Sequence, residues 1–370
     1  MSTERKYPFY LKSTVLLLGL TLFVFVLFSL REIMVPLAFS LLLAILLNPL
    51  VTRLERWKVP RVLAISISLF LAAIVILGIG YFLVSQLANF TDELPTLKTK
   101  TTELFTTLQK WLSREFGVNL KKQQQMLAEL ESDMKPWIGT ALGSMAETLG
   151  MIFLMPVYAF LFIYYKKLLL NFMYELFSQE NSVELTNVLS QTRTAIQSYM
   201  VGLILEAIAV ATLNCAALMI LGVKYAILLG VLGAVLNVLP YIGGIIAIAL
   251  PLIIATITGD GYQTQLGIII AYLVIQFIDN HFLVPLIVSS RVRINALVSI
   301  VIVLLGGALW GIPGMFLSIP FTGVVKIIFD QVPELKPWGK VLGDKVPVRH
   351  KGQIWNAMQM SIGASKRVKK

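Results

Sequence analysis

Long runs of apolar residues alternate with short polar segments along most of this chain. Three of these runs, at residues 13–30, 62–87 and 199–222, reach the roughly 18 to 20 residues that a helix needs to cross a bilayer. Apolarity is continuous within each run, as expected for helices and not for the strands of a membrane barrel. The pattern predicts an all-α polytopic membrane protein with about eight hydrophobic segments.

The order of apolar and charged segments predicts how the chain threads the membrane. With the N-terminus in the cytoplasm, residues 1–87 supply three transmembrane helices, at about 9–30, 33–51 and 62–87. This threading leaves the basic 52–61 loop in the cytoplasm, as the positive-inside rule requires. A fourth segment, at about 138–164, returns to the cytoplasm before Lys166 and Lys167.

Residues 88–137 lie between the third and fourth segments and carry seven basic and seven acidic residues. Leucines at helical spacing predict amphipathic helices there, so we expect a small helical extracytoplasmic domain. Residues 138–330 form the predicted transmembrane transport core, which includes a cytoplasmic helical segment at 165–198. Helical spacing continues from that segment into the next span and predicts one long helix over about 182–222. Residues 331–370 form a basic cytoplasmic tail.

Two of the apolar runs contain residues that interrupt helices. The first run, 225–258, has no charged residue, and the second extends over 295–329. Proline removes a backbone donor and glycine weakens a helix by roughly 1 kcal/mol. In the first run the interrupting residues are Pro240, Gly243 and Gly244, and we group the polar Asn237 with them. In the second run they are Gly306, Gly307, Gly311, Pro313 and Gly314.

The charge rule predicts what the two interruptions do. If each run were one span, the loop containing Arg291 and Arg293 would lie outside the cell. If each run folds back on itself, that loop and the basic tail both face the cytoplasm. We therefore expect two helical hairpins, either re-entrant or fully crossing, and their short arms favour re-entrant ones.

Each broken run follows a helix, and the two pairs enter the membrane from opposite sides. This is the pattern of inverted repeats, in which transporters bind substrate between discontinuous helices near the middle of the membrane. The predicted substrate region therefore consists of the interrupting residues. The alternative is that both interruptions are packing kinks without a binding role.

Composition supports the membrane assignment, because 57% of residues are hydrophobic, 14% are charged and the mean hydropathy is +0.80. The net charge of +11 comes largely from residues 53–61 and from the tail. Such clusters flank membrane segments and contact anionic lipid. They carry no interleaved aromatic pattern, so we expect membrane lipid and not nucleic acid as a partner.

Polar residues within the predicted spans are candidates for ion or proton coupling. Tyr272, Gln276 and Asp279 or Asn280 share one helical face. An aspartate inside a span is costly and normally faces protein or water. Asp279 is therefore the first candidate, and the alternative is a structural hydrogen bond near the cytoplasmic interface.

Glu206 is the second candidate, because Gly202 and Ala209 on its helix are small and allow another helix to bury the carboxyl. The alternative is a satisfied structural carboxyl. His281 is a lone histidine, so no metal site is expected. The chain contains no HExxH, GxxxxGK[ST] or GxSxG motif, and we expect neither an enzyme nor a cofactor.

The second half of the chain contains a set of specific short motifs: Ser198-Tyr199 with Gly202, LGV at 221–223, LPYIGG at 239–244, Pro251, Gln276 with Asp279, Pro285, Gly306-Gly307, Gly311, Gly314 and Pro320. Together these motifs resemble those of the autoinducer-2 exporter family of bacterial permeases. The resemblance implies a multi-pass transporter of the bacterial inner membrane with a homo-oligomeric assembly, and the charge rule predicts that both termini lie in the cytoplasm. The resemblance also implies Asp279 where the family usually has glutamate.

The sequence and the resemblance together predict a transporter that exports a small solute, such as a signalling molecule, or exchanges sodium for protons. Discontinuous helices and membrane-embedded carboxylates would carry this transport. Two alternatives remain open: an oligomeric passive pore or efflux channel, and a membrane scaffold acting through the outer helices and the tail. Substrate identity does not follow from the fold.

Overall fold

A computed structural model describes residues 8–91, Thr106, Arg114, 153–177, 182–238, 243–258, 261–288 and 294–344. Within these ranges the chain is helical and contains no strand. Its elements are α1 (Phe9–Ser29), α2 (Arg31–Arg56), α3 (Arg61–Thr91), the helix Phe153–Tyr164, α6 (Lys166–Leu176), α7 (Ser182–Ile220), α8 (Ala226–Asn237), α9 (Gly243–Thr258), α10 (Tyr262–Ile278), the π-helix η2 (Asp279–Val288), α11 (Ala296–Gln331), η3 (Pro333–Leu335) and α12 (Lys336–Leu342).

The all-α membrane fold is confirmed. Five helices are long and apolar enough to cross a membrane, or up to six if the bent pair of Phe153–Tyr164 and α6 is one span. α7 confirms the predicted long helix and ends at Ile220. The count of about eight segments stays a prediction, and most of 88–137 and all of 345–370 lie outside the described residues.

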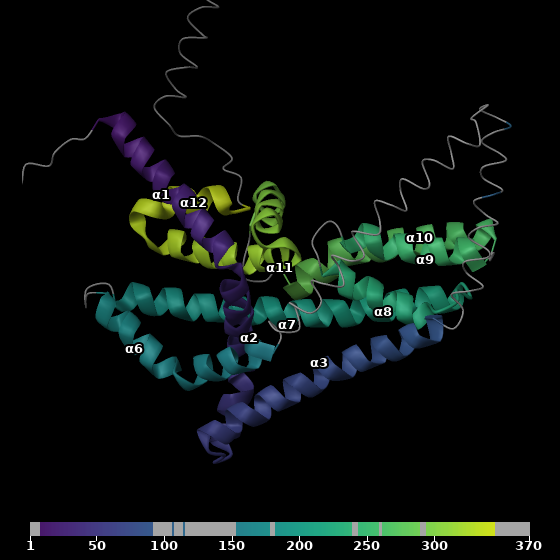
Figure 1. The fold of residues 1–370 in the computed structure, drawn as a ribbon, viewed down its shortest axis with the longest axis horizontal. Coiled ribbons are helices and arrows are strands. Elements are labelled where there is room, and N and C mark those ends of the chain that lie inside the picture. The colour runs from purple at the N-terminus through teal and green to yellow at the C-terminus, as the bar shows by residue number, and fades with distance from the viewer. Residues whose placement is uncertain are drawn as a thin grey trace, which may run out of the picture.

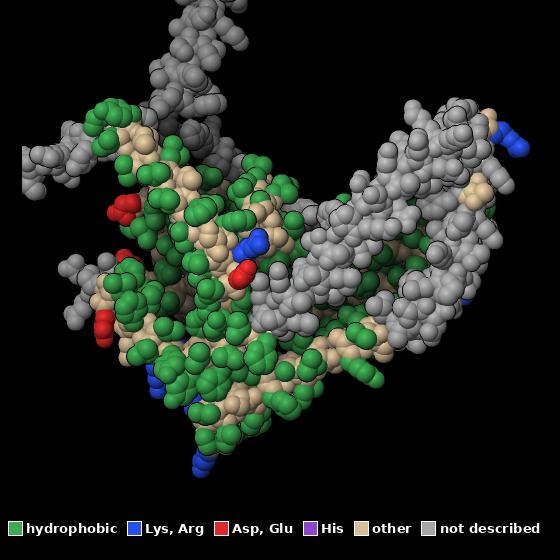
Figure 2. Space-filling model, viewed as in Figure 1, with side chains coloured by type: hydrophobic (Ala, Val, Ile, Leu, Met, Phe, Trp, Pro, Cys, Tyr) green, Lys and Arg blue, Asp and Glu red, His purple; other side chains and the backbone are tan. Residues whose placement is uncertain are grey.

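The surface of the described helices is strongly apolar. Large hydrophobic side chains on α1 and α3 are well exposed, including Leu16 at 69%, Phe70 at 66% and Leu77 at 70%. Figure 2 shows hydrophobic side chains over most of the visible described surface, with few charged ones. A contiguous apolar surface of this kind marks contact with lipid or with another protein. The chain is therefore a multi-pass membrane protein.

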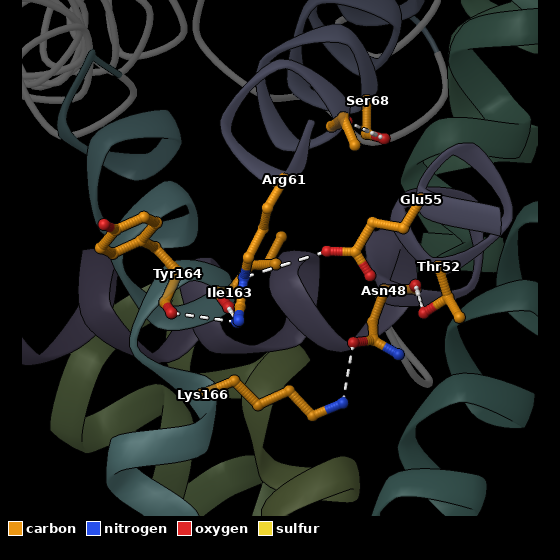
Figure 3. A network of polar contacts seen from close by, with 9 residues as sticks. Asn48, Thr52, Glu55, Arg61, Ser68, Ile163, Tyr164 and Lys166 are labelled. Atoms are coloured by element: carbon orange, nitrogen blue, oxygen red, sulfur yellow. Dashed lines mark hydrogen bonds and ion pairs between the residues drawn. The ribbon is translucent and has the colours of Figure 1, made fainter. Parts of the chain in front are cut away.

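Arg61, at the start of α3, holds together the corner where α2, α3 and Phe153–Tyr164 meet (Figure 3). Its guanidinium donates to the carbonyl oxygens of Ile163 and Tyr164, at 2.8 and 3.0 Å. A cation at a helix C-terminus satisfies carbonyls that lack helical partners. The chain then bends by 61° into α6, which begins at Lys166.

The long helix α7 is the element on which the others assemble. α8 packs along the half of α7 that ends at Ile220, while α2 and the second part of α11 pack along the half that begins at Ser182. In Figure 1, α8, α9 and α10 accordingly lie toward one end of α7, and α6 and α12 toward the other.

The predicted fold-back is confirmed in the second broken run. α11 is interrupted at Gly311, which has φ 65° and ψ −146°, a backbone conformation open to glycine and strained for other residues. A Cβ on Gly306 would lie 2.5 Å from the carbonyl oxygen of Gly314, although a straight helix would separate the two residues by about 12 Å. The chain therefore reverses at Gly311.

The ends of α11 support the same conclusion. Ile294, just before α11, forms an antiparallel bridge with Gly343, just after α12. The Asn295 side chain donates to the carbonyl oxygens of Val341 and Gly343, at 2.6 and 3.2 Å. A straight α11 would hold its two ends about 50 Å apart. Because both ends lie beside α12, residues 296–310 and 312–331 form the two arms of a hairpin.

Two clusters of buried side chains fix these arrangements. One joins the α8–α9 pair to α7 and α10 and contains Leu218, Leu229, Ala255, Ile268 and Tyr272. The other joins α11 to α2 and α7 through Ala38, Leu42, Ile196 and Leu317. Its Phe39 and Phe316 rings stack at 5.4 Å. Each hairpin thus has its own core against one half of α7.

The close approach of Gly306 to Gly314 predicts an unusual response to alanine. Alanine normally stabilises a helix by up to about 1 kcal/mol relative to glycine, but at Gly306 it would clash with backbone and cost about 1 to 3 kcal/mol. We expect Gly306→Ala to lower the midpoint of thermal unfolding in detergent. Gly78→Ala is the control, because no atom lies within 4 Å of its added Cβ. An equal or higher midpoint for Gly306→Ala would contradict the hairpin.

Candidate functional site

At the first interruption, the start of α9 lies against the end of α8. A Cβ on Gly243 would lie 2.7 Å from the Cα of Asn237, so only glycine fits where the two helices meet. Further from this contact, a Cβ on Gly233 would lie 3.4 Å from the Cβ of Ala247. α8 and α9 therefore run antiparallel as a hairpin. Pro240, the predicted proline of this break, lies outside the described residues.

The length of this hairpin limits how far it reaches. α8 has 12 residues and α9 has 16, which at 1.5 Å per residue gives about 18 and 24 Å. The hydrocarbon core of a bilayer is about 30 Å thick. The arms are thus shorter than a full crossing, as expected for a re-entrant hairpin.

Asp279 lies beside the tip of the α8–α9 hairpin. It is the C-cap residue of α10 and the first residue of η2, and π-helical turns, which are rare, often occur at functional sites. Its side chain is 2% exposed. Oδ2 accepts a hydrogen bond of 2.9 Å from Nδ2 of Asn237, while Oδ1 has no partner among the described residues.

Glu206 brings a second carboxyl to the same place. It lies on α7, against which η2 packs, and its side chain is 8% exposed. The Glu206 and Asp279 carboxyls are close enough to interact electrostatically. Two buried carboxylates in apolar surroundings cannot both carry a charge without a counter-ion or a shared proton. The pair therefore forms a site suited to a proton or a small cation.

Amide and hydroxyl groups extend this site along α10. The Gln276 Oε1 atom would lie 2.9 Å from a Cβ on Gly244, and Asn237 Oδ1 would lie 3.5 Å from it. The structure thus brings together Gln276, Gly244 and Asn237 from three elements. Tyr272, one turn earlier, is 6% exposed, and its hydroxyl has no partner among the described residues. Asn280 is exposed and lies away from this group.

Asn214 is a further polar residue near this group, and the sequence analysis did not select it. Its side chain is 2% exposed, and its Nδ2 donates weakly to the Gly230 carbonyl at 3.4 Å. A Cβ on Gly233 would lie 3.3 Å from this Nδ2 and 3.6 Å from the Tyr272 hydroxyl. The sequence did hold a signal, because Asn214 lies eight residues after Glu206 and thus on the same helical face.

The second interruption also lies close to α7. Trp310, next to Gly311, packs in the cluster that includes Met200 of α7, and its indole donates to the Leu27 carbonyl at 3.0 Å. Met200 and Glu206 are separated by about 9 Å along the helix axis. The tips of both hairpins therefore lie near neighbouring turns of α7.

The interrupting residues of α11 form a close backbone contact and not a polar site. A Cβ on Gly307 would lie 2.6 Å from the Met315 side chain. Pro313 and Gly314 begin the second arm, and Ser318 donates to the Gly314 carbonyl at 2.6 Å. Among the described residues, no group of three or more His, Cys, Asp or Glu side chains could hold a metal ion. The polar chemistry lies at the first hairpin.

Comparison with known proteins identifies the family of this chain. A model of the AI-2E family transporters matches residues 14–334. The AI-2 transport protein TqsA of Escherichia coli (strain K12) is 27% identical over 300 residues, covering 81% of this chain and 86% of TqsA. YueF of Bacillus subtilis (strain 168) is 24% identical over 313 residues, covering 81% of this chain and 84% of YueF.

YhhT of Escherichia coli (strain K12) is 28% identical over 306 residues, covering 80% of this chain and 84% of YhhT. YueF and YhhT are named for transport without a substrate. The match to the family model extends from α1 to η3 and includes both hairpins. The chain therefore belongs to the AI-2E family of membrane transporters.

Proposed function

We propose that this chain is a gradient-driven transporter in which Asp279 and Glu206 bind the coupling ion. The observation that supports this most is the hydrogen bond from Asn237 to Asp279. It joins a buried carboxylate directly to the tip of the α8–α9 hairpin. Binding of a proton or sodium ion at Asp279 would therefore change the contact that holds the hairpin tip in place.

In this proposal, the charge of the carboxyl pair determines whether the hairpin tip stays in contact with η2. An unoccupied, doubly ionised pair is costly in apolar surroundings, so the hairpin tip remains against η2 only when an ion or proton balances the charge. Oδ1 of Asp279, which has no partner in the described part of the chain, and the nearby Gln276 Oε1 and Asn237 Oδ1 are oxygen atoms that a proton or sodium ion could bind.

The solute passes between the two hairpins in this proposal. Inverted repeats in transporters bind substrate where discontinuous helices meet near mid-membrane, and both hairpin tips lie near neighbouring turns of α7. TqsA is named for AI-2 transport, so AI-2 is the first small solute to test for export. Exchange of sodium for protons is the second activity to test.

We also propose where the chain lies in the cell. The chain would lie in the bacterial inner membrane with both termini in the cytoplasm, as the basic 53–61 and 331–370 clusters favour. The exposed apolar faces of α1 and α3 suit contact with lipid and with further copies in a homo-oligomer.

Removing the charge of Asp279 should uncouple transport from the gradient. In proteoliposomes, wild-type flux of solute should saturate and follow an imposed pH or sodium gradient. Asp279→Asn keeps the shape and can still contact Asn237, but it cannot bind a proton or balance a cation. We expect gradient-driven flux to fall at least tenfold, while downhill exchange of solute continues.

The two gradients are imposed separately, so the experiment identifies the coupling ion. Full coupling in Asp279→Asn would remove Asp279 from the mechanism. Flux that rises linearly with solute concentration in the wild type would indicate a passive pore and would contradict the transporter proposal.

Glu206 should also contribute to binding of the coupling ion, because its carboxyl interacts with that of Asp279. We expect Glu206→Gln to change the pH or sodium dependence of flux, measured as the ion concentration giving half-maximal rate, by at least threefold. Glu184→Gln is the matched control, since Glu184 lies exposed near the start of the same helix. Equal behaviour of the two variants would show that Glu206 is only a structural carboxyl.

A further inference from the structure

A second polar region lies at the other end of the molecule, away from Asp279. An open cavity of about 800 Å³ is lined by α2, the end of the helix Phe153–Tyr164, α6, the first half of α7 and the second arm of α11. We name it the α2–α7 cavity. Its volume lies within the range of small-molecule sites in proteins. Neither Glu206 nor Asp279 lines it.

Two residues that line this cavity, Asn48 and Thr192, each have a buried polar atom without a partner among the described residues. Asn48 is 8% exposed, and its Oδ1 accepts a hydrogen bond of 3.0 Å from Nζ of Lys166, as Figure 3 shows. Its Nδ2 donor remains unpaired, and so does Oγ1 of Thr192. A buried donor without a partner costs about 1 to 3 kcal/mol, and a ligand with acceptor oxygens would remove this cost.

The charges around the cavity are predominantly positive. Lys166 and Arg193 line it, and none of its described lining residues is acidic. Arg193 and Arg61 are both cationic neighbours of Lys166, while Glu55 is an acidic one. The Glu55 carboxylate lies 3.9 Å from Arg61, which balances part of its charge. The cavity therefore favours an anion.

The remaining walls are mostly apolar, and their apolar side chains come from four elements. Leu42 on α2, Leu169 on α6, Leu189 on α7 and Val324 on α11 all face the same space. A phosphate ion alone would leave these surfaces uncovered. A ligand that fits both parts of the cavity carries an anionic group on an apolar body.

We propose that the α2–α7 cavity binds an amphipathic anion whose phosphate group is held by Lys166, Arg193, Asn48 and Thr192. The apolar body of the ligand packs against the leucine and valine walls. The phosphate belongs either to an anionic phospholipid of the membrane or to a water-soluble phosphorylated amphiphile, because both present the same chemistry. The proposal does not depend on ion coupling at Asp279.

Binding can be measured on the purified full-length chain with two probes. Native mass spectrometry gives the apparent Kd for phosphatidylglycerol, with phosphatidylcholine as the zwitterionic reference. Octyl phosphate, the soluble probe, is titrated against the lipid-free protein and followed by the rise in thermal unfolding temperature. We expect at least one probe to bind the wild type at least tenfold more tightly than phosphatidylcholine does.

Substitutions test whether binding occurs in this cavity. Lys166→Gln with Arg193→Gln removes two charged donors and should weaken binding of the anionic probe about tenfold or more. Lys167→Gln is the matched control, because Lys167 is the next residue of α6, carries the same charge and is exposed outside the cavity. It should leave the Kd within about twofold.

Thr192→Val is a second variant that keeps the experiment decisive if the double variant does not fold. Because Oγ1 of Thr192 has no partner among the described residues, its removal should not lower the unfolding temperature of the free protein. It should nevertheless weaken anion binding about threefold or more.

Preference for phosphatidylglycerol alone would identify lipid as the source of the phosphate, and binding of octyl phosphate alone would identify a soluble ligand. Either result supports the site. Equal binding of phosphatidylcholine and both anions, or an equal loss in Lys167→Gln, would overturn the proposal. A Thr192→Val protein with unchanged anion affinity would overturn it as well.

Discussion

Where a helix is interrupted in apolar surroundings, the backbone N–H and C=O groups that lose their helical partners must lie against protein. The rest of the structure depends on this requirement. Both interruptions of this chain meet it by folding back closely. At the first, Gly243 approaches Asn237, and at the second, Gly306 approaches Gly314. Side chains would prevent each approach. The long helix α7 then supplies one surface for each hairpin, so the two hairpin tips arrive near neighbouring turns of a single helix.

This arrangement gives different chemistry to the two halves of α7. Around the first hairpin tip, Asp279 and Glu206 are buried together, and Asn237 links the aspartate to the hairpin. Around the other half of α7, a cationic cavity forms between α2, α6 and α11. The first region suits a proton or small cation, while the second suits an anionic amphiphile. The proposed coupling site and the proposed anion site therefore differ in charge and in position.

Much of this fold could be predicted from the sequence, because continuous apolar runs and helix-interrupting residues act locally. The long helix α7, the fold-back at Gly311 and the candidates Asp279 and Glu206 all follow from such patterns. The choice between Asp279 and Asn280 did not follow, because one helical face cannot separate positions i+7 and i+8 until a π-helix sets the direction of the side chains. The α2–α7 cavity was also missed, since Asn48, Lys166 and Thr192 come from three separate elements.

The central claim is that the two hairpins enter the membrane from its opposite sides. Its most direct test is labelling of single cysteines, in a Cys215→Ser background, at the exposed Tyr262 after the first hairpin and at Asp344 after the second. A membrane-impermeant thiol reagent is applied to intact cells and to inverted membrane vesicles. The account predicts that Tyr262→Cys is labelled only in intact cells and Asp344→Cys only in inverted vesicles. Labelling of both positions from the same side would contradict it.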